Sequence, residues 1–300
     1  MRLGLYLTSM IQASPVRDLV ELGRLAEDLG FDDLCMGEHV VAADATPAWA
    51  PRAPHPPTET FPEPLTTFAA LAVATSRVRL VTCILIAPLR PAALLAKTAA
   101  TLHALSNGRL VLGVSVSWME PEYAALGIPF EERGVYLDDV VGACRALWST
   151  SPASFSGTTV QFTDMYCEPR PAHPDDITIW FGGICTPRLV RRVAHFGQGF
   201  LPHLNPRDTW EQVATETARI KDAMRVAGRD PSTLEVGVRF PPYGRPFEEQ
   251  LASDMEQMRD AGVTQLYCPL RAPHTVAEAA PLLEKMVRAF EPYRHVAVSG

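Results

Sequence analysis

Residues 79–116 read RLVTCILIAPLRPAALLAKTAATLHALSNGRLVLGVSV, and this stretch decides the fold. Its two ends, 79–86 and 109–116, are short apolar runs that predict strands. Between them, 92–105 carries apolar side chains at helical spacing, and the Ser-Asn-Gly that follows predicts a turn. A strand, a helix and a second strand in this order are the repeating unit of parallel α/β folds.

The same alternation continues in both directions along the chain. Further strands are expected over 2–7, 32–36, 177–181, 198–201, 234–240 and 263–268. Further helices are expected over 16–29, 64–75, 132–148, 187–196, 208–227, 246–261 and 275–290. Eight such units, with no linker or shift in composition between them, predict an α/β fold of the (β/α)8 TIM barrel type, with residues 1–300 in a single domain.

Insertions after strands 2 and 4 interrupt the pattern. The first, 42–64, holds seven prolines between Pro47 and Pro64, so we expect a surface loop there, and long loops in compact domains are usually functional. The second, 149–176, contains short β-like pieces such as 159–162. A doubly wound sheet is the alternative fold, but it would leave both insertions unexplained.

The composition is that of a soluble, core-forming protein. Lys and Arg number 27 against 34 Asp and Glu, which gives a modest net charge of -7. The acidic and basic residues are interspersed along the chain, and this argues against a nucleic-acid or membrane partner. The longest apolar run, 80–89, is shorter than the roughly 20 residues of a membrane span. Since the first residues read as a strand and not as a signal peptide, we expect a cytoplasmic protein. The six cysteines show neither CxxC pairs nor zinc spacing, so neither a disulfide framework nor a metal site is expected.

The strongest candidate for acid–base chemistry is His39, because active sites of such barrels lie at the carboxyl ends of strands and imidazole titrates near neutrality. Glu38 beside it could orient the ring, or it could be a plain ion-pair partner. The alternative is that His39 has only a structural role and hydrogen-bonds to a neighbouring loop. His203 occupies a similar position after the strand over 198–201.

A second candidate is Gly182-Gly183, which follows the fifth strand and precedes a helix for which Thr186 is a plausible N-cap. Glycines let a ligand approach the backbone, and free amides at a helix N-terminus suit a phosphate. The alternative is a tight turn without a ligand. Near the mouth of the barrel, the proline-rich loop offers Trp49 as a contact for a substrate.

Several stretches together resemble a known family. They are 96–102 (AKTAATL), 105–110 (LSNGRL), 112–114 (LGV), Trp118, Glu122, 125–128 (ALGI), 131–134 (EERG), Glu38-His39, Arg90-Pro91, 180–183 (WFGG) and 191–194 (RRVA). The chain is similar in these stretches to the bacterial luciferase-like family of flavin- and F420-dependent oxidoreductases, and most similar to its F420-dependent branch. The resemblance covers nearly the whole chain and implies a homodimeric barrel.

The resemblance also implies where a cofactor would bind. A redox ring would lie over the barrel mouth, against the end of the third strand (Cys83, Ile84, Leu85) and of the fourth (Ser115, Ser117). A phosphate would be held by the amides around Gly183, Ile184 and Cys185. His39 matches the family's histidine near the reactive ring edge. Trp118 stands where sugar-phosphate dehydrogenases of the family have a carboxylate, so we expect it to contact a different small substrate.

Three functions stay open from the sequence. The first is an oxidoreductase that transfers hydride between coenzyme F420 and a small organic substrate. The second is a monooxygenase that uses reduced FMN and oxygen, with a possible partner reductase. The third is a barrel without cofactor that retains only acid–base chemistry at His39, or only binds a ligand.

Overall fold

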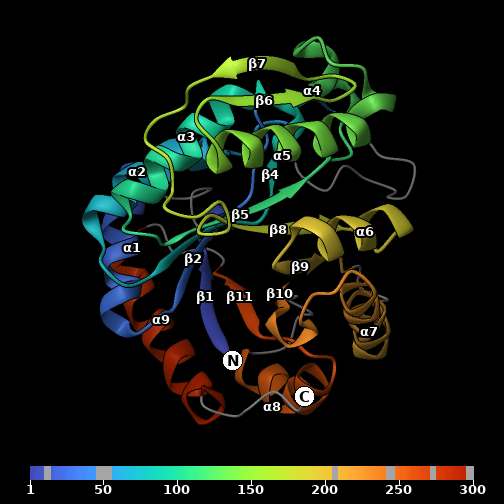
Figure 1. Cartoon of the computed structure of the whole chain (residues 1–300). Coiled ribbons are helices and arrows are strands. Elements are labelled where there is room, and N and C mark those ends of the chain that lie inside the picture. The colour runs from blue at the N-terminus through green and yellow to red at the C-terminus, as the bar shows by residue number, and fades with distance from the viewer. Residues whose placement is uncertain (10–14, 45–55, 205–208, 241–246, 271–274, 295–300) are drawn as a thin grey trace.

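In the computed structural model, eight parallel strands close into a barrel (Figure 1). The structure describes residues 1–9, 15–44, 56–204, 209–240, 247–270 and 275–294. In chain order the barrel consists of β1 (Arg2–Tyr6), β2 (Asp33–Met36), β3 (Arg79–Thr82) with its continuation β4 (Leu85–Ile86), β5 (Leu110–Ser115), β8 (Thr178–Gly183), β9 (Gly199–Pro202), β10 (Glu235–Arg239) and β11 (Gln265–Pro269). Because β1 pairs with β11 and β3 pairs with β5, the sheet has no open edge. The predicted (β/α)8 barrel is confirmed.

Helices follow the strands and cover the outside of the barrel (Figure 1). They are α1 (Asp18–Leu29), α2 (Pro64–Ala74), α3 (Ala92–Leu105), α5 (Arg133–Ser149), α6 (Pro187–Phe196), α7 (Trp210–Val226), α8 (Phe247–Asp260) and α9 (Val276–Phe290). The fourth unit carries additional elements, namely the short helix α4 (Glu120–Ala125) and an antiparallel hairpin of β6 (Ala153–Ser156) and β7 (Gln161–Met165). The hairpin lies within the predicted irregular segment and packs against α5.

The strand predicted over 79–86 is divided in two. Both halves pair with β5, through Leu80 opposite Leu110 and Leu85 opposite Val114. Residues 83 and 84 lie outside this ladder, and the peptide bond between them is cis. The apolar run continues through the break, so hydrophobic pattern alone could not locate it.

Large aromatic side chains fill the inside of the barrel. Trp180 and Tyr267 are fully buried, and their ring centroids lie 6.5 Å apart. Glycines on neighbouring strands make room for them, because a Cβ at Gly4 would lie 2.4 Å from the Tyr267 ring and one at Gly199 would lie 2.3 Å from Trp180. These contacts explain why two strands carry glycine, a residue that otherwise weakens a strand.

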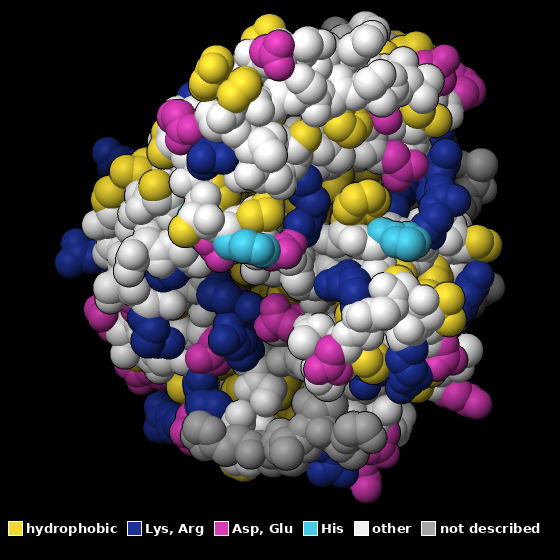
Figure 2. Space-filling model, in the orientation of Figure 1, with side chains coloured by type: hydrophobic (Ala, Val, Ile, Leu, Met, Phe, Trp, Pro, Cys, Tyr) yellow, Lys and Arg dark blue, Asp and Glu magenta, His cyan; other side chains and the backbone are white. Residues whose placement is uncertain are grey.

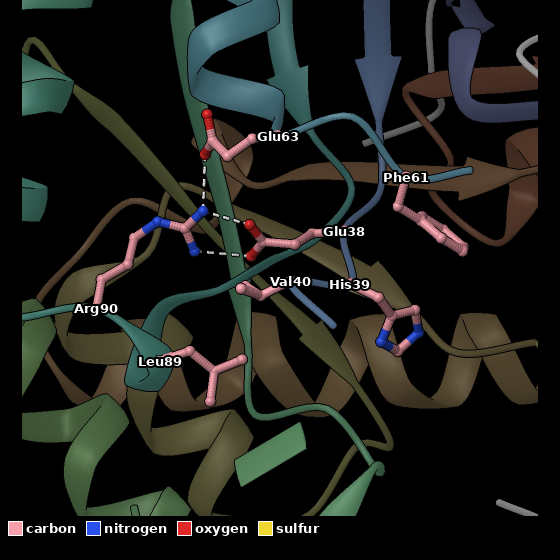
Figure 3. A pocket seen from close by; sticks show the side chains of 7 residues that line it. All are labelled: Glu38, His39, Val40, Phe61, Glu63, Leu89 and Arg90. Carbon is pink, nitrogen blue, oxygen red and sulfur yellow. Dashed lines mark hydrogen bonds and ion pairs between the residues drawn. The ribbon is translucent and has the colours of Figure 1, made fainter. Parts of the chain in front are cut away.

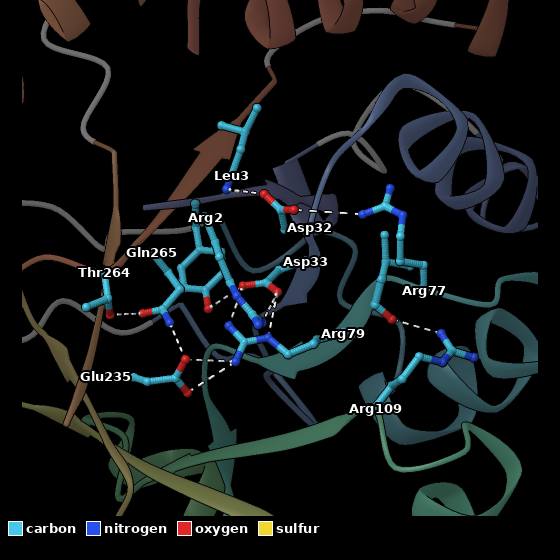
Figure 4. Close-up of polar contacts among 12 residues, drawn as sticks. Arg2, Leu3, Asp32, Asp33, Arg77, Arg79, Arg109, Glu235, Thr264 and Gln265 are labelled. Carbon is cyan, nitrogen blue, oxygen red and sulfur yellow. Dashed lines mark hydrogen bonds and ion pairs between the residues drawn. The ribbon is translucent and has the colours of Figure 1, made fainter. Parts of the chain in front are cut away.

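Charged side chains close the end of the barrel where the strands begin (Figure 4). Arg79 donates from Nε to Oδ1 of Asp33 at 2.8 Å and from Nη2 to Oδ2 at 2.9 Å. Its Nη1 donates to Glu235 at 3.0 Å, and Gln265 donates to the same carboxylate at 2.6 Å. Burial lowers the pKa of Arg79, but the two carboxylates outweigh burial and raise it. This group, which we call the floor network, therefore pairs a fully buried Asp33 with a permanent cation.

The surface carries charges of both signs. On the face in Figure 2, acidic and basic side chains alternate over short distances. None of the helices in the described ranges is long and apolar enough to cross a membrane.

Candidate active site

The other end of the barrel, its mouth, brings together polar side chains from distant parts of the chain. Glu38 and His39 follow β2, Ser115 ends β5, Gly183 ends β8 and Arg239 ends β10. All of these strands are parallel, so their carboxyl ends meet at one side of the barrel, where such folds place their active sites.

His39 is held by a carboxylate that comes from a different unit. Its Nδ1 lies 3.0 Å from Oε2 of Glu122, and Oε1 of the same carboxylate accepts the backbone N–H of Val40 at 2.6 Å. The Glu122 side chain is fully buried and the His39 side chain is 7% exposed, so water screens this pair little. A histidine held at one nitrogen by a carboxylate has a fixed ring orientation and a defined tautomer, as in many acid–base sites.

Aromatic rings hold His39 from two further directions. The centroid of Phe61 lies 5.0 Å from that of His39 and the centroid of Trp118 lies 5.9 Å away, both edge to face. The helix that carries Glu122 is anchored in turn, because the hydroxyl of Tyr123 donates to the carbonyl of Val116 just after β5. The imidazole is therefore positioned before any ligand binds.

Glu38 takes the second of its two expected positions, that of an ion-pair partner (Figure 3). Its Oε2 accepts from Nη1 of Arg90 at 2.8 Å and from the backbone N–H of Ile86 at 2.7 Å, and its Oε1 accepts from Nη2 of Arg90. Burial alone would lower the pKa of Arg90, but its hydrogen bonds to Glu38 and Glu63 outweigh burial and raise the pKa above its usual value. The carboxylate of Glu38 thus fastens the end of β4 to the end of β2, whereas Glu122 orients the imidazole.

A pocket of about 220 Å³ opens beside these residues. Its lining consists of Glu38, His39, Val40, Phe61, Glu63, Leu89 and Arg90 (Figure 3). The volume suits a small organic group, and the lining combines one imidazole, an ion pair and apolar side chains. Such a mixture of apolar walls and few polar groups is typical of small-molecule sites.

The residues expected to contact a cofactor ring differ in their exposure. Cys83 and Ile84 are half-buried, whereas Leu85 is fully buried. The hydroxyl of Ser115 donates to the carbonyl of Gly182 at 2.7 Å, so it ties β5 to β8 and is already hydrogen-bonded. Ser117 has a φ of 59°, a left-handed backbone conformation that is uncommon for residues other than glycine.

The glycine turn after β8 provides the cradle that a phosphate would need. A Cβ at Gly182 would lie 2.6 Å from the side chain of Ile84, so the close approach of these two strand ends requires glycine. Gly183 has a φ of 129°, where any side chain is strained. Thr186 caps α6 as predicted, since its hydroxyl accepts the N–H of Leu189 at 3.2 Å. The turn and the start of the helix therefore fit a phosphate group.

The remaining candidates lie around this turn or outside the described residues. The backbone N–H of His203 donates to the carbonyl of Gly183 at 3.3 Å, and the His203 side chain is exposed. Ile184 is 71% exposed and Cys185 is half-buried. Trp49 lies outside the described residues.

Sequence reasoning gave no role to two residues of the mouth. In the sequence, Glu122 stands out only as part of the family resemblance, and its link to His39 spans 83 positions of the chain. Arg239 is the last residue of β10, and Gly237 on the same strand faces the interior aromatic rings. Side chains two positions apart on a strand point to the same side, so the position of Gly237 could have indicated that Arg239 points toward the inside of the mouth.

Arg239 lies over Tyr6, with the guanidinium carbon 5.5 Å from the ring centroid, and the two side chains share a hydrogen bond. Burial raises the pKa of Tyr6 to about 12. Beside them lie Cys35 and Cys83, which pack in the same cluster of side chains inside the barrel as Tyr6. We refer to these four residues as the mouth cluster.

Comparisons with known proteins give the family and relatives of this chain. The family model described as luciferase-like monooxygenase matches residues 1–295. The F420-dependent glucose-6-phosphate dehydrogenase of Amycolatopsis mediterranei is 30% identical over 200 residues, which are 65% of this chain and 56% of that enzyme.

Solved structures share the fold. The monooxygenase RslO1 from Streptomyces bottropensis has a TM-score of 0.75 at 22% identity, over 98% of this chain and 99% of its own. An F420-dependent secondary alcohol dehydrogenase, solved with an F420–acetone adduct, has a TM-score of 0.74 at 19% identity, over 96% of this chain and 98% of its own.

Proposed function

The chain belongs to the family of luciferase-like monooxygenases, and we propose that within it the protein is an oxidoreductase that transfers hydride between coenzyme F420 and a small organic substrate. The observation that carries the proposal is the His39–Glu122 pair, which holds an imidazole at the barrel mouth beside a small pocket. The F420-dependent dehydrogenase relative supports the choice of cofactor.

The cofactor supplies the hydride chemistry, and the chain's own residues bind it and move the proton. The half-buried Cys83 and Ile84 and the backbone at Ser117 would face the ring, and the amides from Gly183 to Cys185 would hold its phosphate. Because Glu122 holds Nδ1 of His39, we assign proton exchange with the substrate to Nε2. Trp118, which packs against His39, and His203 would contact the substrate. We also propose that the protein is a cytoplasmic homodimer.

A second candidate, an FMN-dependent monooxygenase, is supported by the description of the family itself. The same His39 would then act on a substrate that reacts with oxygen activated by reduced flavin, and a partner reductase would supply the reduced flavin. The two candidates share the residues of the mouth and differ in the ring that these residues bind.

Parallel titrations of the purified protein with F420 and with FMN, followed by quenching of tryptophan fluorescence, test the proposal. We expect F420 to bind more tightly. If FMN binds and F420 does not, the second candidate replaces the first. If neither binds, the barrel has lost its redox chemistry and only acid–base chemistry or ligand binding remains.

The role of His39 is tested by His39→Gln. We expect turnover to fall by about 100- to 10,000-fold, the usual contribution of a positioned acid–base group, with unchanged F420 affinity. Bleaching of the F420 absorption band with a panel of secondary alcohols and related donors measures turnover. His195→Gln, on the exposed side of α6, is the matched control and should behave like the wild type. Equal turnover of His39→Gln and the control would remove His39 from the mechanism.

A further inference from the structure

We propose that Arg239 determines which substrates the protein accepts, because it binds a carboxylate group at the inner wall of the barrel mouth. The inference rests on the proposed function, since it concerns the substrate of the same site. It names the chemical class of that substrate, namely small organic acids whose carboxylate lies several bonds away from the reacting carbon.

The side chain of Arg239 points into the barrel. Arg239 is the last residue of β10 and lies on the same side of the strand as Gly237, where a Cβ would lie 2.8 Å from the ring of Tyr267. Val238, between them, points the other way and packs in the core that includes the helices. The guanidinium carbon accordingly lies 5.5 Å from the centre of the Tyr6 ring, at the end of β1.

A small solute can reach Arg239 through the mouth. The residue is exposed, and because it points inward, this exposure is toward the mouth of the barrel. The side chains inside the barrel form an apolar and aromatic cluster that includes Tyr6, Tyr267, Cys83 and Ile84. A ligand bound to the guanidinium would therefore meet a cation at one point and apolar side chains around it, which favours an organic acid over an inorganic anion.

Arg239 differs from the other arginine of the mouth in having no carboxylate partner among the described residues. Arg90 bonds to Glu38 and Glu63, and the carboxylate of Glu122 lies against the imidazole of the site. These three carboxylates are therefore already engaged by other groups. At an inner wall the effective dielectric constant is lower than in water, so a cation that no carboxylate neutralises attracts an anionic ligand more strongly than a surface arginine does.

A single guanidinium suits a singly charged group. Its planar fork of N–H donors matches the two oxygens of a carboxylate, to which it can donate two parallel hydrogen bonds. The turn at Gly182-Gly183, which fits a phosphate, ends β8, and β10 lies two strands further along the sheet. The phosphate of a cofactor and the carboxylate of a substrate would thus have separate sites.

Arg239 and His39 lie on different sides of the same mouth. His39 follows β2, and β10 is three strands away in the order β2–β1–β11–β10. The interior of an eight-stranded barrel is only wide enough for side chains to fill, so a small organic molecule can reach from one side to the other. Its carboxylate would lie at Arg239 and its reacting carbon near Nε2 of His39, the atom to which we assign proton exchange.

Isothermal titration calorimetry of the full-length protein tests the proposal with matched ligands, namely butyrate against butyramide and benzoate against benzamide. The two members of each pair have nearly the same size, and only the carboxylate is charged. We expect the carboxylate to bind about tenfold more tightly than its amide, because its hydrogen bonds to the guanidinium are charge-assisted. The net charge of the protein is -7, so general attraction of anions would not produce this preference.

Variants assign the preference to one residue. Arg239→Gln should bring the ratio of the two affinities close to one and leave the affinity for the amide unchanged, whereas a purely structural change would weaken both ligands alike. Arg239→Lys should retain part of the preference, because it keeps the charge without the fork. Arg288→Gln, whose side chain is 80% exposed on α9, is the matched control and should keep the full preference. Circular dichroism checks that each variant is folded.

The titrations need no cofactor, so their outcome is separate from that of the F420 titration. Failure of F420 to bind would overturn the proposed cofactor and leave the carboxylate preference measurable. The inference about Arg239 is overturned if neither carboxylate binds more tightly than its amide, or if the preference persists in Arg239→Gln. If that variant instead loses affinity for F420 and keeps the carboxylate preference, the guanidinium binds the cofactor and not the substrate.

Discussion

The two ends of the barrel surround their arginine side chains differently. In the floor network, Arg79 is paired with Asp33 and Glu235 at distances of 2.8–3.1 Å. In the mouth cluster, the corresponding cation, Arg239, has a tyrosine and two thiols as neighbours, and among the described residues it forms no ion pair with a carboxylate. The floor arginine therefore joins strands through ion pairs, whereas the mouth arginine contacts an aromatic ring and uncharged side chains.

The difference helps to distinguish polar residues with a structural role from polar residues with a functional role. The floor network connects the starts of β2, β3, β10 and β11 and is complete within the protein. The mouth contains two matched pairs, His39–Glu122 and Glu38–Arg90, beside residues without a carboxylate partner, such as Tyr6. Position along the barrel axis alone therefore does not separate matched from unmatched polar groups.

The largest expected effect comes from breaking the floor network with Arg79→Gln. The substitution leaves Asp33 fully buried without its bidentate partner, and removal of one member of a buried ion pair costs about 3–5 kcal/mol of folding free energy. Urea unfolding measures the loss. The double variant Arg79→Gln/Asp33→Asn should recover part of it, because neither buried charge of the pair then remains. A loss below about 1 kcal/mol would mean that water or other residues compensate Asp33.

An intermediate effect is expected from Glu122→Gln, which keeps the size of the side chain and removes its charge. The amide can still accept the Val40 N–H but no longer offers a carboxylate oxygen to Nδ1 of His39, so kcat should fall by about 10- to 100-fold while KM changes little. Steady-state kinetics measure both constants. An unchanged kcat would show that Glu122 has only a structural role.

The smallest effect on stability is expected from Arg239→Gln, the counterpart of the first substitution at the other end of the barrel. The variant leaves no buried carboxylate without its partner, and Tyr6 retains its hydrogen bond to Thr8, so the cost should stay below about 1 kcal/mol. The same urea titration allows direct comparison with Arg79→Gln. Similar losses for the two arginine variants would contradict the distinction between floor and mouth.

Local sequence pattern predicted the barrel well, because strands and helices depend on residues two to four positions apart. The chain order of eight strand–helix units and the cap at Thr186 follow from such patterns and are confirmed. The break between β3 and β4 was missed, since Cys83 and Ile84 are as apolar as their neighbours. For this fold, periodicity therefore indicates the elements and not their irregularities.

The partners within the site depend on the tertiary fold, and sequence could name the residues but not pair them. Glu38 is adjacent to His39 in sequence, yet it pairs with Arg90, 52 positions away. Glu122 reaches His39 only because α4 follows β5 and β2 lies two strands from it in the barrel. Adjacent residues on an extended chain point in opposite directions, so sequence neighbours are poor guides to hydrogen-bond partners.

The rings of Trp180 and Tyr267, which occupy the barrel interior above Arg79, determine how ligands exchange. With its centre filled, the barrel offers a ligand only the mouth as an entrance and exit. Under the proposed function, a cofactor bound against the strand ends with the substrate above it would therefore follow a last-in, first-out order. Steady-state kinetics should accordingly show a compulsory sequence, with the cofactor binding first and leaving last, and product inhibition patterns should reflect that order.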